Sequence, residues 1–331
     1  MADGGAWVGL AVAAQTETTV KSSLRPSRKR GCKINKNIRS GQRNMKKLLY
    51  QFDTDEHPSV FDSVVCHDGG ADHVIGHGGV HPHNVGAMVD GTIFTRAPKD
   101  KKSTAIFIGG SNMAEGEALF RAVKKKFFAN FRVSVMLDSN GSNTTAAACV
   151  AWLAHSGSLK GKRAVVLAGT GPVGTRAAVM LASEGASITL TSRQLENAKE
   201  AAAAVKARFG IDVGAVCAAD NDARAKAIAG AHIVVATGAG GVQLLEERHW
   251  KDNPTIELMA DANATPILGI EGVDMMDKGA KRHGKTVFGA IGFGALKIAL
   301  QRACVAKLFE QSDLALDAEE IYALAKTMVG K

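Results

Sequence analysis

The glycine-rich segment Gly169–Gly174 constrains the fold of this chain more than any other feature. It reads G-x-G-x-x-G and stands between the apolar run Arg163–Ala168, which has the length of a buried strand, and a helical pattern that continues to about Glu184. A lone G-x-G-x-x-G is only a glycine-rich turn, but between a strand and a helix it is typical of dinucleotide binding. The first glycine permits the tight turn, the second lets the backbone approach a pyrophosphate, and the third lets helix and strand pack closely.

The end of the next expected strand, 188–191, indicates which dinucleotide is bound. NAD sites usually carry an acidic residue about 20 residues after the first glycine, where it bonds the ribose 2′-hydroxyl. Here the strand leads into Ser192 and Arg193, with no acid from Thr189 to Arg193. A carboxylate would repel a 2′-phosphate, whereas Ser192 can bond it and Arg193 can neutralise it. We therefore predict NADP, with a solvated Arg193 at a helix start as the alternative.

From Met45 onward, short apolar runs alternate with helical patterns, as in parallel α/β proteins. The expected strands are 47–52, 104–108, 133–137, 163–168, 188–191, 212–216, 232–237, 256–260 and 286–289, and the expected helices include 117–128, 294–310 and 317–328. We predict an α/β fold of two α/β domains with an interdomain cleft. The N-terminal substrate domain covers 45–141, and the C-terminal Rossmann-type NADP-binding domain covers 142–331.

Most of the net charge of +9 lies in residues 1–44, which hold nine Lys/Arg and two Asp/Glu. This segment lacks apolar periodicity and is rich in Ser, Gly, Asn and Arg, so we predict a basic, disordered extension. A transit peptide and a nucleic-acid-binding arm are the alternatives. The rest of the chain is close to neutral and shows no nucleic-acid-binding signature.

The cysteines do not indicate a disulfide framework or a zinc ribbon, because they are odd in number and form no C-x-x-C pair. They are Cys32, Cys66, Cys149, Cys217 and Cys304. A reducing cytoplasm is therefore expected. No apolar run approaches the roughly 18 residues needed to span a bilayer, so we expect no membrane partner.

Histidines are concentrated between Val64 and Ala87, where five of the ten occur. The spacing of His73, His77 and His81 would bring metal ligands together only on a helix. Glycines and a proline at 82 interrupt this stretch and argue against a helix. We interpret these histidines as loop residues and predict no metal site.

Known catalytic motifs do not identify the reaction. The sequence contains no G-x-S-x-G, H-E-x-x-H or Walker motif. Tyr322 and Lys326 have the spacing of the Tyr-x-x-x-Lys pair of short-chain dehydrogenases, but they lie too close to the C-terminal end for the structure that normally follows. We interpret them as part of a surface helix, so the substrate chemistry is expected between the two halves.

Several long blocks resemble one family. KKLLYQFDTDEHPSVFD, DGGADH, DGTIFTR, STAIFIGG, MLDSNGSNTTAAA, KGKRAVVLAGTGPVG and FGAIGFGALKIALQRACVAKLFE are similar to the NADP-dependent methylenetetrahydromethanopterin dehydrogenases of methylotrophic bacteria. The resemblance covers essentially all of Met45 to Lys331. It implies a two-domain enzyme that transfers a hydride from the methylene bridge of its pterin substrate to NADP. Because the product cation is spread over two nitrogens, the hydride step needs no acid/base pair.

The resemblance also implies site residues. NADP would be held by Gly169, Thr170, Gly171, Pro172, Val173, Gly174, Ser192, Arg193, Thr237, Gly238 and Ala239. The pterin would contact Asp53, Asp55, Asp68, Gly69, Gly70, Asp72, Asn140 and Asn143, and Lys297 and Asp62 are the catalytic candidates. Two alternatives remain open: a solvated helix lysine at 297, and Asp and Gly residues that only form turns.

Other functions stay open beside this one. A methylenetetrahydrofolate or shikimate-type dehydrogenase could use the same fold, although the shikimate reaction needs a lysine paired with an aspartate, for which the sequence offers no convincing candidate. A non-catalytic NADP-binding regulator with a nucleic-acid-binding tail is the alternative of another class. We expect a homo-oligomer. We also expect no cyclohydrolase activity, because neither of the two tyrosines, Tyr50 and Tyr322, lies in a first-domain Tyr-x-x-x-Lys motif.

Overall fold

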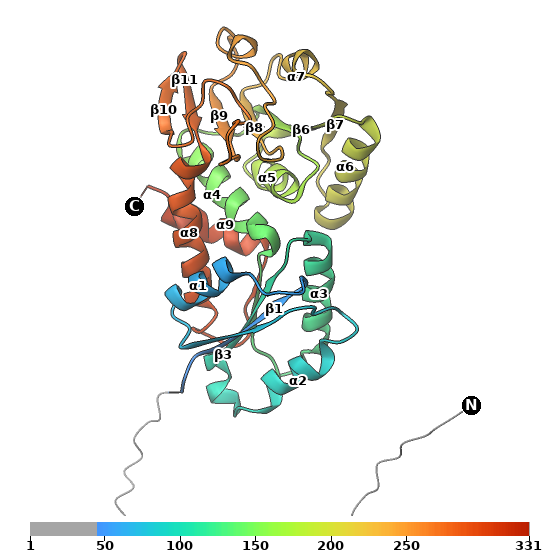
Figure 1. Cartoon of the computed structure of the whole chain (residues 1–331), viewed down its shortest axis with the longest axis vertical. Coiled ribbons are helices and arrows are strands. Elements are labelled where there is room, and N and C mark those ends of the chain that lie inside the picture. The colour runs from blue at the N-terminus through green and yellow to red at the C-terminus, as the bar shows by residue number, and fades with distance from the viewer. Residues whose placement is uncertain (1–44, 331) are drawn as a thin grey trace, which may run out of the picture. The chain divides into compact units, whose positions relative to one another are not determined.

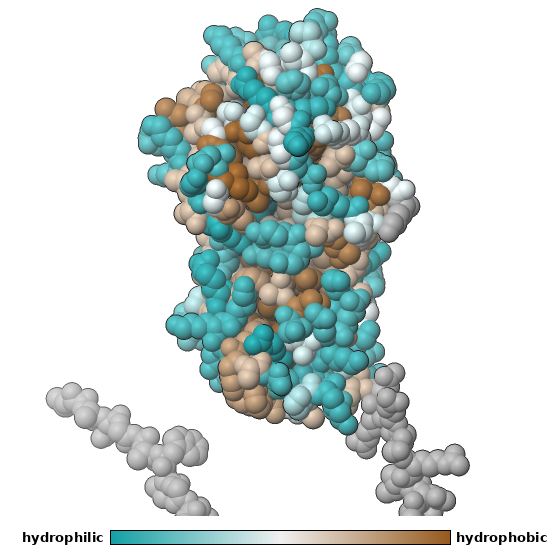
Figure 2. Space-filling view, turned by 180° about the vertical axis from the view of Figure 1, so that it is seen from behind, coloured by the Kyte–Doolittle hydropathy of each residue, from teal (hydrophilic) through white to brown (hydrophobic). Residues whose placement is uncertain are grey.

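The computed structural model describes residues 45–330, so the predictions for the basic segment 1–44 lie outside the described residues. Two sheets account for the strands of this range, and both are flanked by helices (Figure 1). On the face shown in Figure 2, apolar side chains form separate patches among hydrophilic ones. No helix within 45–330 is both long enough and apolar enough to cross a membrane.

The first sheet has five strands in the order β12-β4-β3-β1-β2, all parallel. Its strands are β1 (Leu48–Asp53), β2 (His73–His77), β3 (Thr104–Gly109), β4 (Ser134–Leu137) and β12 (Ala315–Leu316). Its helices are α1 (Val60–Asp68), α2 (Gly86–Phe94) and α3 (Met113–Lys126), with 3₁₀ turns at Pro98–Ser103 and Ser139–Gly141. Every residue of β3 is buried, as expected for a central strand covered on both faces.

The second sheet has seven strands in the order β10-β11-β9-β8-β5-β6-β7, and only β10 runs antiparallel to its neighbour. Its strands are β5 (Arg163–Leu167), β6 (Ser187–Ser192), β7 (Gly214–Cys217), β8 (Ile233–Ala236), β9 (Leu258–Asp261), β10 (Lys278–Arg282) and β11 (Lys285–Phe288). Its helices are α5 (Pro172–Ser183), α6 (Leu195–Phe209) and α7 (Asn221–Ala227), with a 3₁₀ turn at Glu247–His249. This order is the one expected when crossover helices cover a mostly parallel sheet.

Three helices join the sheets: α4 (Ser142–His155), α8 (Ala290–Lys307) and α9 (Ala318–Met328). The helix α4 packs against α5, α8 and α9, and one core cluster extends across all of them (Figure 1). Alanines make up much of α4, which favours a helix and allows close approach on every side. Residues 45–331 accordingly form one compact unit.

Three sequence-based expectations need correction here. The strand β12 comes from the C-terminal part of the chain but pairs with β4, so the first sheet includes residues beyond the expected boundary at 141. The segment His73–His77 is the edge strand β2 and not a loop, because its backbone pairs with β1 over five residues. The helix expected at 294–310 begins earlier, at Ala290.

Candidate functional site

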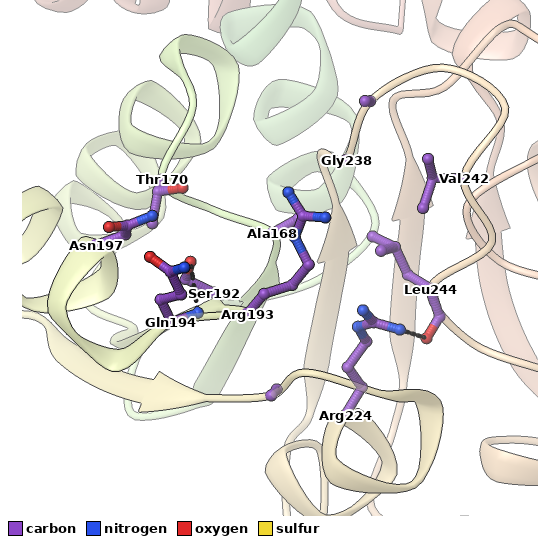
Figure 3. Close-up of a pocket in the computed structure, with 12 residues that line it drawn as sticks. Ala168, Thr170, Ser192, Arg193, Gln194, Asn197, Arg224, Gly238, Val242 and Leu244 are labelled. Atoms are coloured by element: carbon purple, nitrogen blue, oxygen red, sulfur yellow. Dashed lines mark hydrogen bonds between the residues drawn. The ribbon is translucent and has the colours of Figure 1, made fainter.

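The glycine-turn pocket lies at the carboxyl ends of strands in the second sheet and has a volume of ≈ 580 Å³. It is lined by Ala168, Thr170, Ser192, Arg193, Gln194, Asn197, Ala218, Arg224, Gly238, Ala239, Val242 and Leu244. These residues come from the end of β6, from the turns after β5, β6, β7 and β8, and from the helices α6 and α7 (Figure 3). Ligands in open α/β sheets bind at this edge.

The glycine turn has the geometry that phosphate binding requires. A Cβ at Gly174 would lie 2.6 Å from the Cα of Gly169, so the third glycine is fixed by close packing. A Cβ at Gly171 would meet nothing within 4 Å, which leaves this backbone open to a ligand. Gly171 is the N-cap of α5 and no side chain caps the helix, so the N–H groups of its first turn are available to an anion.

The remaining cofactor candidates surround this turn in two different ways. Ser192 ends β6, Arg193 follows it directly, and both line the pocket; Figure 3 shows the Arg193 side chain pointing into it. The Thr237 hydroxyl instead donates to the carbonyl oxygens of Leu167 (3.1 Å) and Ala168 (3.3 Å). Thr237 therefore holds the glycine turn in place, while Gly238 and Ala239 line the pocket.

A second cavity, the lysine pocket, lies at the carboxyl ends of β1, β3 and β4 and has a volume of ≈ 340 Å³. It is lined by Asp55, His57, Ser59, Phe61, Asp62, Gly110, Ser111, Asn140, Gly141, Thr145 and Lys297. All of these except Lys297 come from residues 55–145. Lys297 stands on α8, which begins directly after β11 of the other sheet.

A hydrogen-bonded chain crosses the floor of the lysine pocket. The Lys297 amine donates to Gln301 Oε1 at 2.6 Å, and Gln301 Nε2 donates to Asp62 Oδ1 at 2.8 Å. The Lys297 amine also lies 4.4 Å from the centre of the Phe61 ring, a cation–π contact. A solvated helix lysine, the alternative for this position, is therefore wrong.

The charges around this chain are perturbed by burial. Burial raises the pKa of Asp62, and the Gln301 hydrogen bond and Lys297 oppose this effect. Burial also raises the pKa of the fully buried Asp138 to about 7, again opposed by Lys297. Burial lowers the pKa of Lys297, and the carboxylates of Asp138 and Asp62 oppose this effect. Such coupled shifts in one cavity are typical of functional sites.

The rim of the lysine pocket has an unusual backbone. Asn140 (φ 55) and Gly141 (φ 58) are both left-handed, and the Asn140 N–H donates to the Gly110 carbonyl at 2.7 Å. Asp138 fixes the start of α4, because it accepts hydrogen bonds from the Thr144 N–H (3.0 Å) and hydroxyl (2.6 Å). Left-handed non-glycine residues persist where the surroundings impose them, often at functional sites.

Comparison with known proteins identifies the family. A model described as "Methylene-tetrahydromethanopterin dehydrogenase, N-terminal" matches residues 60–140. The chain is 60% identical over 285 residues to the "Bifunctional protein MdtA" of Methylorubrum extorquens, covering 86% of this chain and 99% of that protein. It is 35% identical over 293 residues to the "NAD(P)-dependent methylenetetrahydromethanopterin dehydrogenase" of the same organism, with the same coverage, 86% and 99%. The chain belongs to the methylenetetrahydromethanopterin dehydrogenase family.

Solved structures show a more distant likeness. The quinate dehydrogenase of Corynebacterium glutamicum aligns with 12% identity and a TM-score of 0.48, covering 86% of this chain and 99% of that one. The family model matches the part of the chain that carries Asp62 and Asn140. Lys297 lies outside that match.

Of the substrate candidates in this methylenetetrahydromethanopterin dehydrogenase family member, the lysine pocket brings together Asp55, Asp62, Asn140 and Lys297. Asp55 accepts hydrogen bonds from the N–H and hydroxyl of Ser111, both at 2.9 Å. Asp53 is 1% exposed and does not line the pocket. Its carboxylate accepts from the N–H groups of Asp55 and Ser59, so it shapes the loop that carries the pocket residues.

The loop of Asp68, Gly69, Gly70 and Asp72 lies at the amino ends of the strands of the first sheet, opposite the lysine pocket. This corrects the expectation that the loop shapes the cleft. It connects the end of α1 to the start of β2, and Leu48 at the amino end of β1 pairs with His73. Asp68 pairs with Arg302, and Asp72 accepts from the Lys47 N–H at 2.7 Å. Parallel strands place their amino ends together, away from the pocket at their carboxyl ends.

Asn143 is also not a pocket residue. It is fully buried, its side-chain amide donates to the Leu137 carbonyl at 2.7 Å, and its side-chain oxygen accepts from Arg176 Nε at 2.8 Å. Arg176 in turn pairs with Glu117 of α3. Asn143 therefore belongs to a polar contact that links α3 and α5 across the two sheets.

Sequence reasoning missed two residues that surround Lys297 and Asp62, namely Asp138 and Gln301. Gln301 follows Lys297 by four residues on one helix, so i, i+4 spacing would have placed it beside the lysine. Asp138 directly follows β4, as Asp53 ends β1, and this shared position at strand ends was the available signal. No group of three or more His, Cys, Asp or Glu side chains within 45–330 is arranged to hold a metal ion.

Proposed function

We propose that this chain transfers a hydride from methylene-tetrahydromethanopterin to NADP+, giving methenyl-tetrahydromethanopterin. The observation that carries the proposal is the position of Lys297. Its helix α8 starts at the carboxyl end of β11 in the sheet with the glycine turn, and its side chain lines the pocket of the other sheet. Seven residues of helix separate the two points, about 10 Å along the axis. One rigid element thus fixes the distance between cofactor side and substrate side.

The chemistry of the lysine pocket suits formation of a cation. When bound, NADP+ accepts the hydride, and positive charge develops over the two nitrogens that flank the bridge carbon. Asp62 lines the pocket and supplies negative potential at this place. Lys297 and Gln301 orient that carboxylate, and the Lys297 amine can also donate to a polar edge of the pterin. No residue has to take up a proton in this step.

NADP fits the glycine-turn pocket better than NAD. The open approach at Gly171 and the uncapped start of α5 fit a pyrophosphate. At the end of β6, Ser192 and Arg193 line the pocket where an NAD site would carry an acid. The relative named NAD(P)-dependent leaves both cofactors open for that protein, and the side chains present here favour the 2′-phosphate.

The decisive experiment compares substrates with the purified full chain. NADPH formation is followed with methylene-tetrahydromethanopterin, methylene-tetrahydrofolate and shikimate, and each is repeated with NAD+. We expect the highest kcat/KM for the methanopterin substrate with NADP+. A preference for folate would establish the first alternative. Shikimate stays in the comparison because a lysine and an aspartate do share the lysine pocket, joined by Gln301, although the sequence had shown no such pair.

The absence of cyclohydrolase activity remains a prediction. Tyr50 lies in β1 stacked with His77, and Tyr322 donates to Glu184 at 3.0 Å, so neither tyrosine lines the lysine pocket. Lys326 bonds the same Glu184 carboxylate at 2.9 Å, which gives this Tyr-x-x-x-Lys pair a packing role. Rapid hydrolysis of the methenyl product by the pure protein would contradict the prediction.

A homo-oligomer and a cytoplasmic location are kept as proposals on the same footing. Sedimentation of the purified chain tests the first, and fractionation of cells tests the second.

Loss of NADPH formation with every pterin, combined with salt-sensitive DNA binding that disappears on deletion of residues 1–44, would favour the regulator over the enzyme.

A further inference from the structure

The glycine-turn pocket contains a second guanidinium that the β6 pattern does not predict. Arg224 of α7 lines this pocket and is 7% exposed. Figure 3 shows its guanidinium beside Leu244, on the side of the pocket that also holds Arg193. The residue reaches the pocket from α7, the helix that follows β7, a different element from the strand end that carries Ser192 and Arg193.

All hydrogen-bond partners of Arg224 are neutral. Its guanidinium donates to Asn221 Oδ1 at 2.7 Å and to the Ala219 carbonyl at 3.0 Å, with a longer contact of 3.5 Å to the Leu244 carbonyl. Three of its five N–H groups can make these bonds, which leaves two donors for a ligand. The contacts hold the side chain in one place, so it is preorganised.

The charge of Arg224 is not compensated within the described part of the chain. None of the carboxylates of residues 45–330 forms an ion pair with Arg193 or Arg224. Burial lowers the pKa of Arg224, Asp220 opposes this effect, and the neighbouring Arg193 adds to it. A buried charge without a partner is costly, and the buried Arg224 together with the exposed Arg193 at one pocket fits an anion of charge close to −2.

We propose that Arg224 is a specificity-determining residue that binds the 2′-phosphate of NADP together with Arg193. Arg193 reaches the phosphate from β6 and Arg224 from α7, so the anion is held by two guanidinium groups on separate elements. The inference rests on the proposed use of NADP. It goes further by assigning discrimination against NAD to a residue outside the strand end where this property is normally sought.

The test measures binding of NADP+ and NAD+ to the full-length Arg224→Gln variant by calorimetry, without any pterin. Charge-assisted hydrogen bonds make the expected effect about 10- to 100-fold weaker NADP+ binding, with NAD+ binding changed by less than about threefold. A matched control is Arg163→Gln. Arg163 also donates to two backbone carbonyls, those of Ala227 and Ala229, but does not line the pocket, so the ratio of the two affinities should not change.

Equal weakening of both cofactors by Arg224→Gln would overturn the proposal and leave Arg224 as a clamp between Ala219 and Leu244. If that variant does not fold, Arg224→Lys retains the charge and should keep a preference for NADP+ over NAD+. In this variant 2′,5′-ADP should compete with NADP+ for the pocket, whereas 5′-ADP should not. Loss of the preference in the lysine variant together with equal competition by both compounds would also overturn it. Because no pterin is present, failure of the pterin reaction does not affect this result.

Discussion

The glycine-turn pocket is built from turns that each follow a strand of one sheet, whereas the lysine pocket depends on side chains far apart in the chain. In the first, the glycine turn after β5 is marked by Gly169, Gly171 and Gly174, and its backbone at Gly171 is open to a ligand. In the second, the contact between Gln301 and Asp62 joins residues 239 positions apart. A backbone-built site can be recognised from a local pattern, but a site built from distant side chains becomes visible only after folding.

The largest expected effect tests the lysine pocket. Lys297→Ala removes the amine that orients Gln301 and Asp62 and leaves two carboxylates without their cation, so we expect kcat/KM for the pterin to fall roughly 100-fold or more. Lys307→Ala is the matched control, since Lys307 is an exposed lysine of the same helix. Unchanged kinetics in Lys297→Ala would remove this residue from the site.

The next effect separates two glycines of one turn. Gly171→Ala places a methyl group where nothing lies within 4 Å, so its stability should change by less than about 1 kcal/mol while NADP+ binding weakens about tenfold or more. Gly174→Ala instead forces a Cβ to within 2.6 Å of the Gly169 backbone and should cost about 1–3 kcal/mol of stability. Thermal unfolding and cofactor titration of both variants check this. Similar behaviour of the two would show that the pocket does not depend on backbone approach.

A third effect concerns pH. Burial raises the pKa of Asp62, and the proposed role needs its ionised form, so kcat should rise with pH through a pKa above the ordinary aspartate range. Asp62→Asn should remove this acid limb and lower kcat at neutral pH by about tenfold. Burial raises the pKa of Asp138 to about 7, so Asp138→Asn is measured beside it to separate the two carboxyl groups. Rate profiles of both variants measure this, and an acid limb unchanged in Asp62→Asn would contradict the assignment.

The smallest effect is expected at the amino ends of the strands of the first sheet, opposite the lysine pocket. Asp68→Ala removes a pair with Arg302 in which both side chains are nearly half exposed, 43% and 47%. Such pairs contribute about 0–1 kcal/mol, and the residue is remote from the lysine pocket, so kcat/KM should stay within about twofold of the wild type. A large kinetic loss would mean that the pterin extends around the sheet edge.

The predictions from sequence succeeded where structure is local. The strand β5 and the helix α5 beside the glycine turn end at Leu167 and Ser183, within one residue of the expected ends at 168 and 184, because local backbone geometry determines them. The loop of Asp68 and Asp72 was misplaced because α1 was not recognised. Val60, Phe61 and Val64 of α1 are 77%, 51% and 54% exposed, so only Val65 and Cys66 among its apolar residues mark a buried face. Because that helix was not predicted, the sequence did not indicate that the chain returns from the carboxyl end of β1 to the amino end of β2.

The origin of Lys297 and β12 has a consequence for synthesis on the ribosome. The first sheet emerges early, but its fifth strand, residues 315–316, and the lysine of its pocket follow every strand of the second sheet along the chain. Domains generally fold as they emerge, N-terminal part first. Here the edge strand of the first sheet and the cation of its carboxylates are made only after the strands of the second sheet, so the nascent protein cannot have a complete substrate site before the strands of its cofactor domain have been made.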